Sequence, residues 1–308
     1  MNRAPTFQRY IARRGLLWLP SEKMDPLQQV QKQSLLDYGL ALLISLGAED
    51  VSVAVPEARH AAVTAAIRMG RDLGIHVRLI GSEPGLPEAL RAGRPELLGS
   101  PLMAAPLGLF LSAKNPLELA LQDTRQRGAT VFVAPATGGG RGIHVTADAL
   151  GLVNDISPCA DMGALSRGAA ALGLTFLDAR ALDFASWLSV ASTSEEGQAA
   201  LLRLYASERG LRAGTLPAAA AWHQLGPDTG VTDAHRFVAR QRKAGSGLFG
   251  LPEVAAFERG LIGVPELQDA AIHHAGSRLG EALERRLNEG VPDIFDPRII
   301  PLRAISSG

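Results

Sequence analysis

The sequence predicts an α/β fold with a doubly wound, mostly parallel sheet, helices on both faces, and a C-terminal helical region. Short apolar runs alternate with helix-like segments up to about residue 185, which is the pattern of a parallel sheet with crossover helices. Beyond that residue the strand pattern stops. The predicted strands are 51–55, 76–80, 107–111, 130–134, 152–156 and 174–177, and predicted helices include 57–73, 115–128 and 157–173.

Turn and capping residues divide the chain into three parts. Residues 1–24 are predicted to be an irregular arm, residues 25–185 a Rossmann-like α/β domain, and residues 186–308 a helical region with a tail. Asp25-Pro26 is expected to begin a helix that continues to about Leu46, because proline suits the first helical position.

The C-terminal part contains a long predicted helix at 265–288. Its apolar residues recur at helical spacing: Leu267, Ala271, Ile272, Ala275, Leu279, Ala282, Leu283 and Leu287. Such a stripe is expected to pack on the α/β domain or on a second copy of the chain, so a homo-oligomer is one predicted assembly. The earlier stretch 245–250 matches G-x-G-x-x-G, but no apolar strand precedes it, and we expect a turn between helices there.

Charge and composition restrict the class of protein. The 308 residues include 31 Lys or Arg and 31 Asp or Glu, so the formal net charge is zero. Because nucleic-acid-binding proteins normally carry a basic excess, nucleic acid is not expected as the main partner. No apolar run approaches the roughly 18 residues that span a bilayer, and the only cysteine, Cys159, cannot form an intrachain disulfide. We therefore expect a globular cytoplasmic protein with no membrane partner.

A glycine-rich turn follows the clearest predicted strand, 130–134. Its residues Thr137, Gly138, Gly139, Gly140, Arg141 and Gly142 are predicted to bind an anionic group. Glycines let successive backbone N–H groups converge on an anion, and an arginine adds a bidentate contact. The alternative is a surface loop with no ligand.

Downstream of this turn, His144, Asp155 and Cys159 are the candidate catalytic residues. Cys159 is predicted near the start of a helix that Ser157-Pro158 begins, where the helix dipole lowers a thiol pKa. A cysteine beside a histidine can act as a nucleophile. The competing interpretation is that Cys159 is a small packed side chain and His144 a loop residue.

Two functional hypotheses follow. The first is an enzyme acting on a small anionic ligand, phosphate-bearing or nucleotide-like, bound at the carboxyl edge of the sheet. The second is a non-catalytic interaction or assembly protein on the same scaffold, which the lack of a Walker, G-x-S-x-G or H-E-x-x-H motif favours. The sequence leaves open whether the chain is an enzyme, and it indicates no particular cofactor, metal or reaction.

Overall fold

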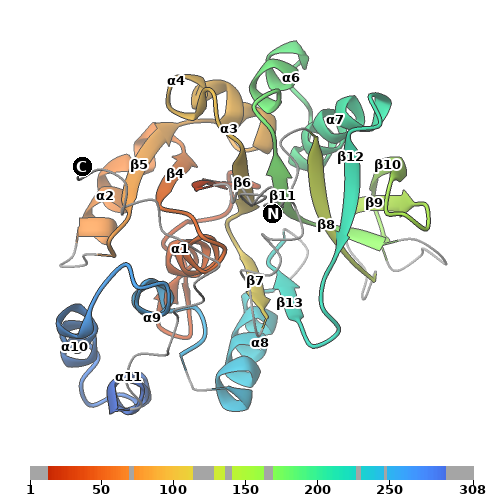
Figure 1. The fold of residues 1–308 in the computed structure, drawn as a ribbon. Coiled ribbons are helices and arrows are strands. Elements are labelled where there is room, and N and C mark those ends of the chain that lie inside the picture. Colours follow the sequence, from red (N-terminus) through yellow and green to blue (C-terminus); the bar gives the residue numbers. More distant parts are fainter. Residues whose placement is uncertain are drawn as a thin grey trace, which may run out of the picture.

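The computed structural model describes residues 13–68, 73–113, 128–135, 141–162, 169–226, 230–245 and 248–288. Within these ranges nine strands form one sheet with helices on both faces, so the α/β prediction is confirmed (Figure 1). Its strands are β1 (Arg14–Trp18), β4 (Asp50–Val55), β5 (His76–Gly81), β6 (Leu102–Pro106), β8 (Ala129–Pro135), β9 (Gly142–Ala147), β10 (Val153–Cys159), β11 (Ala169–Leu177) and β12 (Leu211–Thr215).

The sheet is mostly parallel. β1 pairs in parallel with β4 and β6, β4 with β5, and β8 with β12. β11 is antiparallel to β6, β8 and β9, and β10 is antiparallel to β9. Therefore β10 and β11 run against the other seven of the nine strands.

The prediction of an irregular N-terminal arm through residue 24 is wrong. Strand β1 lies between β4 and β6 in the centre of the sheet, and Leu16 and Leu17 are fully buried. The apolar run 16–19 is short and follows two arginines, so its pattern did not predict a strand. The helix expected from Asp25 also begins later, because Leu27 N–H donates to Asp25 Oδ1 and makes a turn there. A small hairpin follows, β2 (Gln29–Val30) and β3 (Gln33–Ser34), and Ser34 caps helix α1 (Leu35–Ser45).

The helix predicted at 157–173 is wrong at both of its ends, because residues 157–159 and 169–173 are strands. Ser157 and Pro158 belong to β10, which continues the predicted strand 152–156, and β11 extends the predicted strand 174–177 toward its N-terminal side. Pairing with β9 supplies the hydrogen bonds that overrode the local helix-start pattern. The predicted strand 107–111 begins two residues too early: Leu107 and Gly108, the latter with a φ of 87°, form the turn between β6 and strand β7 (Leu109–Ser112).

The region after residue 185 contains strands as well as helices, contrary to the prediction. β12 joins the main sheet, and β13 (Ala221–Gln224) pairs with β7. The predicted helix 265–288 is two helices, α10 (Val264–His273) and α11 (Arg278–Asn288), and the buried part of its stripe packs in this chain's own core. The stretch 245–250 lies between α8 (Val231–Ala244) and α9 (Pro252–Glu258), as predicted.

Two apolar cores lie on opposite faces of the sheet. One includes side chains from α1, α2 (His60–Arg68) and α8 to α11. The other includes side chains from α3 (Leu86–Ala92), α4 (Arg94–Leu97), α6 (Ala181–Trp187) and α7 (Ser194–Ser207). Figure 1 shows α3, α4, α6 and α7 in the upper half of the molecule and α1 and α8 to α11 in the lower half.

Candidate functional site

The strand order places the switch point of the sheet between β1 and β6. The chain proceeds from β1 to β4 and β5 on one side, and then crosses to β6 on the other side of β1. In open α/β sheets, ligands bind in the crevice outside the carboxyl ends of the strands at such a point. Here those ends are Trp18 and Pro106.

Buried side chains of the chain itself occupy this edge: Leu19 is 2%, Met24 7% and Leu107 0% exposed. Leu107 N–H donates to Trp18 O at 2.8 Å, and Gly85 N–H donates to Leu19 O at 2.9 Å. A Cβ on Gly108 would lie 3.2 Å from Leu225 Cβ and 3.3 Å from Met24 Cε. The connection between β1 and β2, residues 19–28, contains no glycine. This connection therefore lacks the glycines with which phosphate-binding turns approach an anion.

The carboxyl ends of β4 and β5 lie close together at the same edge. Ser82 N–H donates to Val55 O at 3.1 Å, and a Cβ on Gly81 would lie 2.9 Å from Glu57 Cγ. The Ser82 hydroxyl donates to Glu83 O at 2.7 Å. These groups close the edge beside β1 with local hydrogen bonds.

The predicted anion-binding turn lies only partly within the described residues. Thr137, Gly138, Gly139 and Gly140 fall outside them, whereas Arg141 is described and exposed. Gly142 is the first residue of β9 and pairs with Cys159 of β10. A Cβ on Gly142 would lie 2.9 Å from Met162 Cγ, so this glycine permits close packing at the base of the hairpin.

The three candidate catalytic residues share one face of the β9–β10 hairpin. His144 pairs with Ser157, Gly142 with Cys159, and Asp155 with Thr146. Directly opposed residues point to the same side of a sheet, and residues two apart share that side. The opposite side carries the buried Ile143, Val145 and Ile156. His144, Asp155 and Cys159 therefore belong to the solvent-facing polar side.

The prediction that Cys159 lies at the start of a helix is wrong. Cys159 is the last residue of a strand, so no helix dipole acts on its thiol. Its Sγ lies 3.3 Å from Asp161 O, and the side chain is half-buried. The hairpin places a thiol, an imidazole and a carboxylate on one surface.

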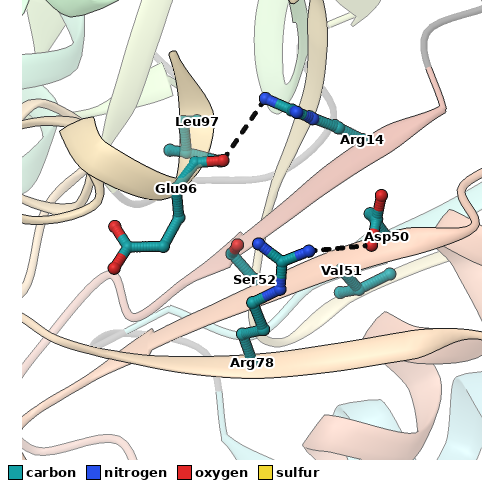
Figure 2. Close-up of a pocket in the computed structure, with 7 residues that line it drawn as sticks. All are labelled: Arg14, Asp50, Val51, Ser52, Arg78, Glu96 and Leu97. Atoms are coloured by element: carbon teal, nitrogen blue, oxygen red, sulfur yellow. Dashed lines mark hydrogen bonds and ion pairs between the residues drawn. The ribbon is translucent and has the colours of Figure 1, made fainter.

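A small polar pocket lies at the opposite, amino edge of the sheet (Figure 2). Its volume is about 10 Å³, the size of a single water. Arg14 donates to Glu96 O and Leu98 O at 3.3 and 3.0 Å, and Arg78 pairs with Asp50 at 3.2 Å. Arg14 thus joins the start of β1 to α4, and Arg78 joins β5 to the start of β4, which are structural roles.

A second cavity, of about 120 Å³, lies beside α1, α2 and β5. Its lining is apolar apart from Asp37, and includes Leu40, Ile67 and Val77. The Asp37 carboxylate accepts the Ser34 N–H at 3.0 Å and so caps α1. This lining does not suit a phosphate group.

Asp178 follows the antiparallel strand β11, and it therefore lies at the amino edge, near the start of β8. Its carboxylate accepts the Gly128 N–H at 2.6 Å, the Arg180 Nε–H at 2.9 Å and the Tyr205 hydroxyl at 2.9 Å. Arg180 also pairs with Glu208 and lies 5.4 Å from the Tyr205 ring centre. Burial, together with the Asp178 carboxylate, raises the pKa of Tyr205 well above its usual value. This buried network is structural.

His223 lies in an aromatic cluster between β7, β13 and α8. Its ring stacks on Phe237 with centroids 5.7 Å apart and lies 6.1 Å from Phe110. Its Nε2 is buried without a hydrogen-bond partner in the described part of the chain. Burial lowers the pKa of His223, the carboxylate of Asp233 raises it, and Arg240 lowers it.

We therefore expect stability to fall as the pH drops below the ordinary histidine range near pH 6.5, because the unfolded chain binds the His223 proton more readily. The measurement is the free energy of unfolding in urea at about pH 7.5 and about pH 5.5. His223→Phe should reduce the difference between the two values, and His76→Gln, at an exposed position, should not. If the unfolding free energies at the two pH values differ as much in His223→Phe as in the wild type, His223 is not the cause of the pH dependence.

Within the described ranges, no three His, Cys, Asp or Glu side chains are grouped so as to hold a metal ion. In the same ranges, no helix combines the length and apolarity needed to cross a bilayer.

Comparison with known proteins gives a fold and no family. No protein-family model matches the chain, and no curated protein sequence matches it significantly. Among solved structures, UDP-glucose pyrophosphorylase complexed with UDP-glucose is similar with a TM-score of 0.62 at 10% identity, covering 75% of this chain and all of that one.

Two further structures are similar over comparable lengths. A putative glucose-1-phosphate thymidylyltransferase from Bacillus anthracis gives a TM-score of 0.59 at 12% identity, over 73% of this chain and 94% of its own. The inositol-1-phosphate CTP transferase from T. maritima gives 0.58 at 12% identity, over 76% and 98%. The chain therefore has the fold of these nucleotidyltransferases.

Proposed function

We propose that this chain is an enzyme that binds a small phosphate-bearing ligand, a sugar phosphate or a nucleotide sugar. The observation that carries the proposal is that the chain matches three nucleotidyltransferases over 94 to 100% of their lengths. The names of these neighbours specify sugar phosphates, inositol phosphate and nucleotides as what they act on. Fold alone does not transfer an activity, so the residues of this chain must supply the site.

The β9–β10 hairpin is the part of the chain that best suits such a ligand. Arg141 is exposed at its start, and its guanidinium fork matches phosphate geometry. The adjoining polar side carries His144, Asp155 and Cys159, which offer a proton acceptor, a charge and a thiol for a ligand bound at Arg141. The crevice at the switch point between β1 and β6, where ligands bind in other open α/β sheets, is filled by Leu107, Leu19 and their neighbours.

Titration calorimetry with UDP-glucose and with glucose 1-phosphate tests the binding proposal. Arg141→Ala should weaken binding by about 1.5 to 3 kcal/mol, as for losing a charge-assisted hydrogen bond. Gly139→Val should block the ligand while leaving the melting temperature unchanged. Arg236→Ala, which removes an exposed arginine on α8, is the matched control. Equal affinity in all variants would remove the 137–142 turn from the site.

The second candidate is a non-catalytic binding protein, and the filled crevice between β1 and β6 favours it. The two candidates differ in turnover. A nucleotidyltransferase transfers the nucleoside monophosphate group of a nucleoside triphosphate to the phosphate oxygen of a sugar phosphate. The α–β phosphoanhydride bond breaks, and pyrophosphate is released. Binding in the calorimeter without pyrophosphate release from any nucleoside triphosphate and sugar phosphate would support the non-catalytic candidate.

A further inference from the structure

The β2–β3 hairpin has an unfavourable turn. Its two central residues, Gln31 and Lys32, have φ values of 49° and 67°, in the left-handed region that side chains disfavour. Hairpins with a two-residue turn of this kind normally use Asn or Gly there. A turn made of Gln and Lys therefore depends on outside contacts to remain in place.

Helix α8 supplies those contacts from about 200 residues further along the chain. The Gln31 N–H donates to His235 Nδ1 at 3.2 Å, and the Gln31 side-chain amide donates to His235 O at 3.2 Å. Arg242 donates to Gln31 O at 3.0 Å, to Tyr38 Oη at 3.3 Å, and to Gln33 Oε1. The turn is thus bound to α8 through both its N–H and its carbonyl oxygen.

The hairpin is continuous with the segment that fills the crevice between β1 and β6. Residues 19–28 lead directly into β2, and they carry Leu19 and Met24 into the closed edge. Two main-chain hydrogen bonds join this segment to the start of α1, from Leu35 N–H to Gln28 O at 3.1 Å and from Leu36 N–H to Pro26 O at 3.0 Å. Leu225, which packs beside Met24 at Gly108, lies just ahead of α8 in the chain.

We propose that α8 is a latch that holds the β2–β3 hairpin and the crevice-filling segment closed, and that protonation of His235 releases it. The accepting nitrogen of a neutral imidazole becomes a donor when the ring is charged. A protonated His235 would then direct an N–H at the Gln31 N–H, and this contact would be lost. Opening of residues 19–34 would expose the crevice at the switch point of the sheet.

The charges around His235 give the pH dependence its sign. The hairpin carries Lys32, and α8 carries the Asp233–Arg236 pair together with Arg240, Arg242 and Lys243. Of the other strands packed on α8, β7 has no titratable residue, and β13 has His223. A charge on His235 adds to this mostly positive set, and it turns the accepting Nδ1 into a donor that faces the Gln31 N–H. A charged His235 is therefore expected to open the latch, and a neutral His235 to keep it closed.

Hydrogen exchange of the full chain, followed by mass spectrometry, tests this proposal without any ligand. Exchange in peptides covering 19–34 is measured at about pH 7.5 and about pH 5.5, with each rate divided by the intrinsic chemical rate at that pH. This ratio, called the corrected opening, should increase in the wild type by roughly three- to tenfold at the lower pH, as for loss of one hydrogen bond. His235→Gln, which cannot be charged, should show a smaller change between the two pH values than the wild type, and measuring both in the His223→Phe background removes the separate contribution of His223.

Two comparisons keep the test specific. His273→Gln, at an exposed position on α10, should retain the wild-type pH dependence. The double variant Gln31→Gly with Lys32→Gly relieves the turn, and its hairpin should stay protected at both pH values. Equal corrected opening at both pH values in the wild type, or an unchanged pH dependence in His235→Gln, would overturn the proposal, whatever the outcome of the ligand titrations.

Discussion

Replacing Asp178 with alanine is expected to lower the free energy of unfolding by about 3 to 5 kcal/mol, the usual cost of removing one partner of a buried charged pair. The Asp178 side chain is 6% exposed. Its removal would take the carboxylate acceptor from the Tyr205 hydroxyl, the Gly128 N–H and the Arg180 Nε–H, and would leave Arg180 with Glu208 alone. Urea unfolding at neutral pH measures the loss.

The matched control is Asp183→Ala. Asp183 also pairs with an arginine, Arg94, at 2.8 Å, but both side chains are about half exposed. Exposed pairs of this kind contribute at most about 1 kcal/mol. Similar losses in Asp178→Ala and Asp183→Ala would show that burial of the Asp178 network does not stabilise the fold.

Replacing Gly250 with alanine is expected to cost about 2 to 4 kcal/mol, the sum of a positive φ and an overpacked core. Gly250 has a φ of 81°, and a Cβ there would lie 2.2 Å from Cδ1 and Cε1 of Tyr38. The Tyr38 ring cannot easily move aside, because its hydroxyl donates to Val30 O and accepts from Arg242.

Gly260→Ala separates the two contributions. Gly260 has a similar φ of 66°, but no atom lies within 4 Å of the position of its Cβ. Its replacement should cost only about 1 kcal/mol, from the backbone conformation. The difference between the two melting temperatures measures the collision with Tyr38. Equal losses would contradict the close packing of Gly250 on that ring.

The fold class and several strands could be predicted from local pattern alone. The β-branched run at 51–55 and the run at 130–134 are buried strands, as their composition indicates. Alternation with helical segments then predicted the parallel core. These features depend on residues close together in sequence, so a local pattern contains enough information.

The candidate site was less predictable. His144, Asp155 and Cys159 do share a surface, but on a hairpin and not around a helix N-terminus. Ser157-Pro158 is a helix-start pattern, and only the partner strand β9 makes it a strand. β12 was missed because its sequence, LRAGT, has a glycine and an arginine and becomes a strand through its pairing with β8.

The sequence by itself determined the class of the fold and the positions of three of the seven strands that run in the common direction, β4, β5 and β8. Only the tertiary structure decided the order of the strands, the reversed direction of β10 and β11, and the filling of the crevice between β1 and β6. The physical reason is that these features depend on contacts between distant residues, such as Met24 with Gly108 and Leu225, or Gln31 with His235. No local pattern of polarity encodes which distant segments meet.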